Sequence, residues 1–464
     1  MARFLLTVWP FPSHYFPMLA IARALRDRGH DVAFYTGERA RPDVEREGFA
    51  CFAFEDVDAG RVDEIMLSRD HFASWRVPLR LKALLHEWLL GTVPGQVQDL
   101  TRLLAGWRPD VILSETAMLA PMMVLHETAR VPVAVFSTLA ACMLPGPDAP
   151  PPGLGLPRPR GWSTRLAARA ASATMNVLAF DFRRAVNVLR RRYGLRPITT
   201  SFTEFTGRMP LYLVPTTPEF DYERRDLPAS VQYVGPCLWN AGTHEAPPAW
   251  LAELPRDRPW VHVTEGTMHT QPPVLLRAAA KGLAGRPMQV VMTTGSHRDP
   301  ASLGLGPGAA NVRVERWIAH QFLLGHTDVV VTTGGAGTVM TVLEAGVPLV
   351  VVPTEWDKPE NAQRVVEAGA GVRLAPHRLT PERLRAAVEE VLREPSYRRN
   401  ARRLAAAFTS YRGPARAAEL LESLTTEPPP VVSDTTGPGP YREKRISCTP
   451  RPCPSLWREP SSPS

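Results

Sequence analysis

One glycine-rich stretch offers the clearest chemistry in this sequence. A β-branched run predicts a strand that ends at Thr332, and Gly334–Thr338 (GGAGT) then leads into a helix predicted to begin near Thr338 and to end at Gly346. A strand, a tight turn and a helix N-terminus present free backbone N–H groups and a positive dipole end to an anion, ideally a phosphate. The alternative is a turn that needs glycine only for its backbone conformation.

Two common nucleotide-binding patterns do not fit this turn. Gly335-x-Gly337 begins like a dinucleotide fingerprint, and Asp357 follows about 20 residues later, but the third glycine of the pattern would fall at Met340. A P-loop is excluded as well, because no glycine-lysine-Ser/Thr run occurs anywhere in the chain.

His14 lies at a second position suited to chemistry. It follows a predicted strand at Phe4–Val8 and precedes a predicted helix at Pro17–Gly29. Glu115 lies just beyond another predicted strand, Val111–Leu113. Open parallel sheets bind ligands at the carboxyl ends of their strands, so both side chains are expected at a ligand edge. A lone histidine in a loop is also a common surface residue.

Two parallel sheets are needed to position these residues. Short apolar runs alternate with amphipathic stretches, and a strand, a helix and a second strand within about 35 residues form a βαβ pattern. The pattern restarts in the second half, which predicts two doubly wound α/β halves. The predicted strands are Phe4–Val8, Val32–Tyr35, Phe49–Phe54, Val111–Leu113, Val133–Phe136 and Leu211–Val214, then Trp260–Val263, Gln289–Met292, Val312–Val314, Val329–Thr332, Leu349–Val352 and Val372–Leu374.

The length of 464 residues exceeds one ordinary core and favours two domains. We predict an N-terminal α/β domain over residues 1–215, a polar linker without a clear period over 216–255, and a second α/β domain over 256–426. Residues 427–464 are rich in Pro, Ser, Thr and Arg with few apolar side chains, which predicts a disordered tail.

Composition narrows the class of protein. The net charge of +8 comes from arginines interleaved with acids, which favours a solvated surface over a nucleic-acid or membrane footprint. Five cysteines without a C-x-x-C pair argue against a zinc or disulfide framework. No run approaches the roughly 18 apolar residues of a spanning helix, and the start of the chain does not read as a signal peptide. The sequence therefore predicts a cytoplasmic protein.

Two further stretches carry open alternatives. Pro145–Arg160 is a loop rich in proline and glycine, and it leads into an arginine-rich helical region, Thr164–Arg192. The helical region is interpreted as a solvated face, with a weak peripheral membrane or partner surface as the alternative.

Five motifs in order resemble those of family 1 GT-B glycosyltransferases of the UDP-glycosyltransferase superfamily. The chain is most similar to the bacterial branch that decorates macrolides and other natural products, and the similarity spans roughly residues 3–424. The motifs are SHYFP at Ser13–Pro17, RGHDV at Arg28–Val32, VQYVGP at Val231–Pro236, VTEGT at Val263–Thr267, and the block from GGAGT to PEN that ends at Asn361. The resemblance implies a GT-B fold, in which two Rossmann-like domains face a cleft.

The resemblance also implies a nucleoside-diphosphate sugar as donor, bound by the carboxyl half. Trp317 matches the residue that stacks on the nucleotide base, although a core tryptophan is the alternative. Gly335, Gly337 and Thr338 match the turn over the diphosphate, and Asp357 matches the acid that binds sugar hydroxyls. The implied donor-binding set is Gly266, Thr267, Trp317, His320, Thr333, Gly335, Gly337, Thr338, Asp357, Lys358 and Asn361.

Several donor positions depart from the family pattern. Thr333 replaces the usual histidine before the glycines, His320 replaces a glutamine, and Lys358 replaces the glutamine of an Asp-Gln pair. A lysine is a point charge without an acceptor atom, unlike the amide it replaces. We therefore expect a TDP-deoxysugar or an acidic sugar rather than ordinary UDP-glucose, and another UDP-sugar stays open as the donor.

The resemblance implies His14 as the general base and Glu115, in place of the family aspartate, as the group that orients it. It implies inversion at the anomeric carbon without a metal or other cofactor. The aglycone is expected to be hydrophobic, since Trp9–Tyr15, Phe72–Leu90 and Ser137–Leu144 are rich in apolar side chains, which could equally be core. No nucleic acid is expected, and a monomer and a homodimer both remain open. A GT-B epimerase or hydrolase, or a degenerate auxiliary protein, are the alternatives.

Overall fold

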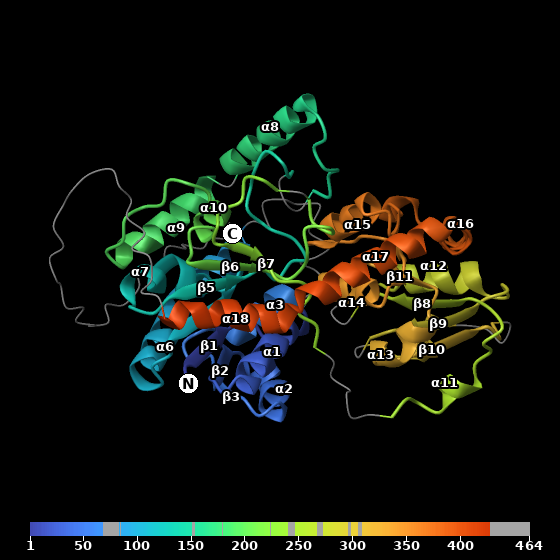
Figure 1. Ribbon diagram of the computed structural model, residues 1–464, viewed down its shortest axis with the longest axis horizontal. Helices are drawn as coiled ribbons and strands as arrows, with labels where there is room; N and C mark the ends of the chain where they lie inside the picture. The colour runs from blue at the N-terminus through green and yellow to red at the C-terminus, as the bar shows by residue number, and fades with distance from the viewer. Residues whose placement is uncertain are drawn as a thin grey trace, which may run out of the picture. The chain divides into compact units, whose positions relative to one another are not determined.

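A computed structural model describes residues 1–67, 83, 85–150, 154–178, 180–222, 224–239, 246–266, 272–295, 298–304 and 309–426. Their strands form two separate parallel sheets, of seven and six strands, which confirms the predicted pair of doubly wound halves (Figure 1). The predicted disordered tail 427–464, the donor residue Thr267 and much of Phe72–Leu90 lie outside the described residues.

The first sheet has the strand order β3-β2-β1-β4-β5-β6-β7. The order reverses between β1 and β4, and such a switch point is where open α/β sheets bind ligands. All neighbouring strands are parallel, with Phe4 of β1 opposite Val111 of β4. The strands are β1 (Arg3–Thr7), β2 (Asp31–Thr36), β3 (Ala50–Ala53), β4 (Val111–Glu115), β5 (Val133–Phe136), β6 (Leu211–Val214) and β7 (Val231–Tyr233).

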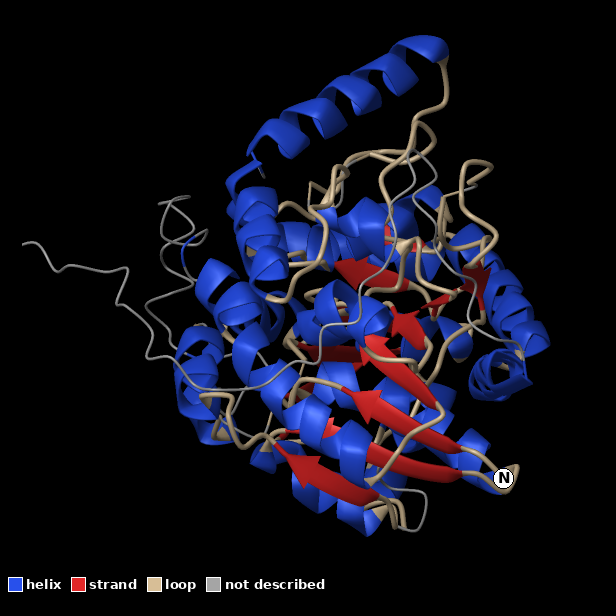
Figure 2. Ribbon diagram, turned by 90° about the vertical axis from the view of Figure 1, so that its left-hand side faces the viewer, coloured by secondary structure: helices blue, strands red, loops and turns tan. Residues whose placement is uncertain are grey.

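Helices cover both faces of this sheet, as Figure 2 shows for the strands enclosed between helices. Two of the helical segments, η3 and η4, are π-helical turns. The segments are α1 (Pro12–Asp27), η1 (Glu38–Ala40), α2 (Arg41–Arg46), α3 (Ala59–Leu67), η3 (Glu87–Gly91), α6 (Val93–Gly106), η4 (Pro121–Leu125), α7 (His126–Thr128), α8 (Trp162–Leu178), α9 (Phe180–Arg192) and α10 (Phe202–Thr206).

The second sheet has the order β10-β9-β8-β11-β12-β13, with its switch point between β8 and β11. Its strands are β8 (Trp260–Thr264), β9 (Gln289–Thr293), β10 (Val312–Glu315), β11 (Val329–Thr332), β12 (Leu349–Val351) and β13 (Gly371–Arg373). The helical segments of this half are α11 (Trp250–Glu253), α12 (Val274–Leu283), η5 (Pro300–Leu303), α13 (His320–Leu323), η6 (Leu324–His326), α14 (Ala336–Glu344), α15 (Lys358–Glu367), η7 (Pro376–Arg378), α16 (Pro381–Arg393), α17 (Pro395–Tyr411) and α18 (Gly413–Thr426).

The buried core is divided by each sheet into two layers. Alternate residues of β1 separate in this way, because Leu5 joins one cluster while Phe4 and Leu6 join the cluster on the other face. In the second sheet, Val331 and Val330 separate in the same manner. Strands buried on both faces explain the continuous apolar runs in the sequence.

Two parts of the chain differ from the predicted domain boundaries. The stretch predicted as a linker, 216–255, contains β7, which pairs with β6 as the edge strand of the first sheet. The end of the predicted second domain, α18, packs on the first half, where Ala417 and Leu421 join the cluster around Phe4. A three-residue strand is too short to show a period, and the apolar face of a helix does not identify its partner.

The arginine-rich region forms α8 and α9, and α8 stands apart from the sheets in both views (Figures 1 and 2). Trp162, Leu166 and Val177 of α8 are exposed. The solvated face, and its alternative of a membrane or partner surface, stay predictions.

Candidate active site

His14 and Glu115 meet at the switch point of the first sheet. Helix α1 begins at Pro12, so His14 lies in its first turn, and the prediction of a loop position with a helix from Pro17 is wrong. The helix starts earlier because Pro12 occupies the first turn, where a missing N–H costs nothing. His14 Nδ1 lies 2.6 Å from Glu115 Oε2, so the longer glutamate side chain reaches the ring.

Glu115 is fully buried and both of its carboxylate oxygens are used. Oε2 contacts His14, and Oε1 accepts a 2.7 Å hydrogen bond from the backbone N–H of Trp9. Two donors on one carboxylate fix its orientation. The hydrogen bond at Nδ1 places the proton of neutral His14 on that nitrogen and leaves Nε2 free to accept another.

The charges around His14 change its acidity. Burial alone would lower the pKa of His14, but the charge of Glu115, their hydrogen bond and the charge of Asp357 raise the pKa above its usual 6.5. Asp357 begins the segment that leads into α15, so a carboxylate of the second half acts on a histidine of the first.

The glycine-rich turn after β11 has an anion-binding form. Helix α14 begins at Ala336, two residues before the predicted start near Thr338, because Gly335 is extended and acts as the N-cap. No side chain caps this end, so the N–H groups of the first turn, which includes Gly337 and Thr338, face outward without a capping oxygen. Only Gly334 uses a positive φ, of 91°.

Thr333 and Gly266 lie together beside this turn. The Thr333 hydroxyl donates a 3.1 Å hydrogen bond to the carbonyl oxygen of Glu265, the neighbour of Gly266. The hydroxyl hydrogen of Thr333 is therefore used in a bond within the protein, and toward a ligand its oxygen can only accept a hydrogen bond. The buried Glu265 also forms an ion pair with Arg298, with 2.8 Å between Oε2 and Nη1.

Trp317 and His320 follow β10 and have different environments. Trp317 is 48% exposed, which suits a stacking surface better than the alternative of a core residue. His320 is partly buried, and this burial lowers its pKa to about 4. Its ring lies 5.7 Å from that of the buried His262 on β8. The lowered pKa favours the neutral form of His320.

The start of α15 brings together the predicted sugar-binding residues. Asn361 Nδ2 donates to Asp357 Oδ2 at 2.7 Å and to the carbonyl oxygen of Gly334 at 2.9 Å. Asn361 Oδ1 is buried, and none of the described residues donates a hydrogen bond to it. Lys358 Nζ is held by Glu355 Oε1 at 3.0 Å and by the Thr354 hydroxyl at 2.9 Å.

Helix α15 is also tied to loops of the first half. Arg364 donates to Asp221 Oδ1 at 2.9 Å and to Glu360 Oε2 at 2.8 Å, and all three side chains are buried. Asp221 Oδ2 accepts from the backbone N–H of Cys142, and Glu360 Oε1 accepts from that of Gly155 at 2.7 Å. The segment Ser137–Leu144, expected at the aglycone, and the loop Pro145–Arg160 are thus both attached to the network around α15.

Sequence reasoning missed three residues at this site. Glu265 supplies the carbonyl that holds Thr333, while Trp88 and Trp356 bring the two halves into aromatic contact, with ring centroids 6.5 Å apart. The position of Trp356 directly before Asp357 was an available signal. Trp88 lies within Phe72–Leu90, one of the segments expected at the aglycone, but the sequence did not single it out or reveal its contact with Trp356.

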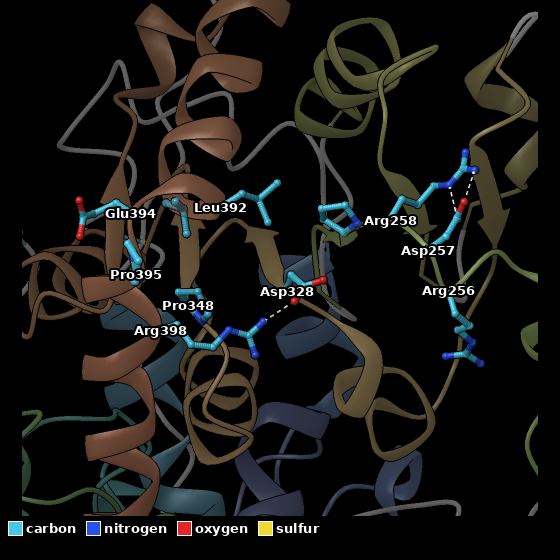
Figure 3. A pocket seen from close by; sticks show the side chains of 11 residues that line it. Arg256, Asp257, Arg258, Asp328, Pro348, Leu392, Glu394, Pro395 and Arg398 are labelled. Atoms are coloured by element: carbon cyan, nitrogen blue, oxygen red, sulfur yellow. Dashed lines mark hydrogen bonds and ion pairs between the residues drawn. The ribbon is translucent and has the colours of Figure 1, made fainter.

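A pocket of about 390 Å³ lies at the opposite edge of the second sheet (Figure 3). Asp328 and Pro348 precede β11 and β12, so the pocket opens at the amino ends of these strands. Its charged side chains pair with one another, for instance Arg398 with Asp328 at 2.7 Å. The pocket is therefore distinct from the site around His14.

Among the described ranges, no helix is long and apolar enough to cross a membrane. Within the same ranges, no group of three His, Cys, Asp or Glu side chains is placed to hold a metal ion.

Comparisons with known proteins give the class of this molecule. The chain matches the model of the Erythromycin biosynthesis protein CIII-like, C-terminal domain over residues 289–424, and that of the Glycosyl transferase 4-like domain over residues 18–197. Its fold is similar to those of the kitacinnamycin glycosyltransferase (TM-score 0.69, 22% identity, 91% of this chain and 99% of that one) and of CalG4, the calicheamicin glycosyltransferase (TM-score 0.67, 22% identity, 92% and 98%). The architecture is that of a GT-B glycosyltransferase.

Curated relatives align over nearly the same length. The 4'-demethylrebeccamycin synthase of Lentzea aerocolonigenes is 37% identical over 91% of this chain and 99% of its own length. The demethyllactenocin mycarosyltransferase of Streptomyces fradiae is 25% identical over 91% of this chain and 87% of its own. The chain belongs to the glycosyltransferases of natural-product biosynthesis, as the resemblance predicted.

Proposed function

We propose that the protein is an inverting glycosyltransferase that moves a sugar, preferably from a TDP-deoxysugar, to a hydroxyl of a hydrophobic aglycone. One observation carries the proposal: the partly exposed His14, paired with the buried Glu115, lies at the switch point of the first sheet, with Asp357 of the second half close enough to raise the pKa of His14. The names of the two curated relatives support an acceptor from natural-product biosynthesis.

In the proposed reaction, His14 Nε2 removes the proton of the acceptor hydroxyl as its oxygen attacks the anomeric carbon. Glu115 stabilises the imidazolium that forms, because its carboxylate already holds Nδ1 at 2.6 Å. The bond from the anomeric carbon to the phosphate oxygen breaks, and the diphosphate leaves with that electron pair. A single displacement from the opposite face inverts the anomeric configuration.

The leaving diphosphate is stabilised by the first turn of α14, where uncapped N–H groups and the positive end of the helix dipole face it. Exposed Trp317 stacks on the base. Gly266 adjoins the phosphates, and Thr267 is assigned the same role from the motif alone.

The sugar is held at the start of α15. The unpaired acceptor atom of Asn361, Oδ1, is suited to a sugar hydroxyl, and Asp357 accepts from a second one. Because Glu355 neutralises Lys358, we favour a deoxysugar over an acidic sugar. A partly exposed base with a buried, orienting carboxylate gives no support to a degenerate, non-catalytic protein.

The test combines a binding screen with product analysis. A thermal-shift screen of UDP, TDP and their sugars is expected to give the largest stabilisation with a TDP-deoxysugar, since a specific ligand stabilises the folded state by mass action. NMR of the product is expected to show the inverted anomer. A clear preference for UDP-glucose would overturn the donor assignment, and sugar release without an acceptor would favour the hydrolase or epimerase instead.

A further inference from the structure

A chain of aromatic rings links the two halves beside His14. The ring of Phe11 lies 5.5 Å from that of His14 and 6.3 Å from that of Trp88, in edge-to-face arrangements. Trp88 in turn lies 6.5 Å from Trp356, at an interplanar angle of 81°. Trp88 is therefore two ring contacts, and Trp356 three ring contacts, from the proposed base.

Trp88 has an unsatisfied polar atom. The residue is 6% exposed, and its indole N–H is buried without a hydrogen-bond partner among the residues that the structure describes. Its neighbour Trp9, with ring centroids 5.8 Å apart, donates its own indole N–H to the carbonyl of Ala117 at 3.0 Å. A buried donor costs free energy unless it is paired, so we interpret the N–H of Trp88 as a donor for an acceptor atom of a ligand.

The backbone around both tryptophans is unusual. Trp88 lies in the π-helical turn η3, a form of helix found frequently at functional sites. Trp356 has φ of 60°, which bulky residues rarely adopt and which is retained mostly at ligand sites. Trp356 thus combines this costly backbone conformation with the contact to Trp88, directly before Asp357, which begins the proposed sugar-binding segment.

We propose that Trp88 and Trp356 form an acceptor subsite for a planar aromatic aglycone that carries a ring carbonyl. This inference rests on the proposed function. The aromatic rings provide apolar surfaces that favour offset or edge-to-face contact with a flat ring system. The Trp88 N–H donates to the ring carbonyl. Trp88 comes from the acceptor half and adjoins Phe11, which touches His14, so the ligand is the acceptor rather than the sugar.

The direct test removes the hydrogen-bond donor from the protein in one variant and the carbonyl acceptors from the ligand in one probe. The probes are 2-hydroxyanthraquinone and 2-hydroxyanthracene, which differ in the ring carbonyls, and their Kd values are measured by calorimetry on the full chain with TDP present. The unchanged protein is expected to bind the quinone about 5- to 50-fold more tightly. Trp88→Phe keeps an aromatic side chain, smaller than the indole, but removes the N–H, and this ratio is expected to fall to about 1. A ratio that survives in Trp88→Phe would overturn the subsite.

Trp9→Phe is the matched control from the same cluster. It removes an N–H that the protein itself uses, so it is expected to lower stability yet keep the preference for the quinone. Loss of the preference in both variants would contradict a specific role for the Trp88 N–H.

A second variant tests the subsite independently if Trp88→Phe does not fold. Trp356→Gly removes the ring at a φ that glycine adopts freely, so the fold is expected to survive. The affinity for 2-hydroxyanthracene is expected to fall by about tenfold, while that for cyclododecanol changes little. Unchanged affinity for 2-hydroxyanthracene, or no binding of either planar probe by the unchanged protein, would overturn the subsite. Binding of the planar probes without any sugar transfer would instead contradict the proposed function.

Discussion

The polar groups of the two halves are used in opposite ways. In the first half, Glu115 is buried with both oxygens occupied by Trp9 and His14. In the second half, the first turn of α14 has no capping side chain, and a buried oxygen of Asn361 lacks a donor among the described residues. A group that moves a proton must be held in one orientation, whereas a site for an anion and a sugar needs donors and acceptors kept unpaired for the ligand.

The largest expected effect comes from His14→Ala. Removing the base is expected to lower the rate of transfer about 10²- to 10⁴-fold, as general-base catalysis generally contributes. TDP affinity should stay unchanged, because the proposed diphosphate site, the first turn of α14, lies in the other half. Initial rates and calorimetric titration of TDP check both statements.

His377→Ala, at an exposed histidine, serves as the matched control for His14→Ala. It should affect neither rate nor TDP affinity. Full activity of His14→Ala would refute the assignment of the base and remove the contrast between the halves.

The second prediction tests the contact that holds the halves together. Arg364→Met leaves Asp221 and Glu360 as buried carboxylates without their cation, which is expected to cost about 3–5 kcal/mol of the free energy of unfolding. Urea denaturation measures this loss. Arg385→Met removes a partly exposed i,i+4 pair with Glu389 and should cost less than about 1 kcal/mol. Equal losses in the two variants would contradict a special role for the buried cluster.

The third prediction concerns pH. Because Glu115 raises the pKa of His14, the neutral form that acts as a base becomes populated only as pH rises through a value above 6.5. In Glu115→Gln the pKa of His14 falls, so the acidic limb of kcat/KM should move to lower pH. The plateau should drop by roughly 10²-fold, since Trp9 and His14 contact different oxygens of Glu115 and the amide NH2 that replaces one of them cannot accept a hydrogen bond.

The pH–rate profiles of the two proteins decide this point. A limb that stays in place after Glu115→Gln would show that the carboxylate does not set the protonation of His14. A lower limb with an unchanged plateau would remove the orienting role but keep the electrostatic one.

Much of the fold and part of the site could be predicted from the sequence. Buried parallel strands are recognisable in the sequence as β-branched runs, and the predicted bounds of β1, β8 and β11 agree with the structure to within a residue or two. His14, Glu115 and Asp357 follow such strands, and the switch points of two sheets bring them together. Their catalytic roles stay predictions.

The remainder depends on contacts between distant segments. The edge strand β7 has too few residues to show a period, and α18 does not reveal in its own sequence that it packs on the first half. The approach of Trp88 to Trp356 joins residues 268 positions apart, and such tertiary contacts have no local signal. The use of the Thr333 hydroxyl by Glu265 likewise depends on the pairing of β8 with β11.

The smallest expected effect separates the shape of the donor turn from its binding surface. Gly334 has φ of 91°, and a Cβ there would lie 2.6 Å from Val351 Cγ1, so Gly334→Ala is expected to cost about 1–3 kcal/mol in the free energy of unfolding and to weaken TDP binding. A Cβ at Gly337, within the first turn of α14, meets no protein atom within 4 Å. Gly337→Ala should therefore gain up to about 1 kcal/mol in stability as a helix residue. If the diphosphate lies over this turn, the same methyl group must weaken TDP binding although the protein becomes more stable. TDP affinity that is unchanged in Gly337→Ala would place the diphosphate elsewhere. It would also remove the contrast between the first half, whose polar groups are paired within the protein, and the second, whose polar groups are kept for the ligand.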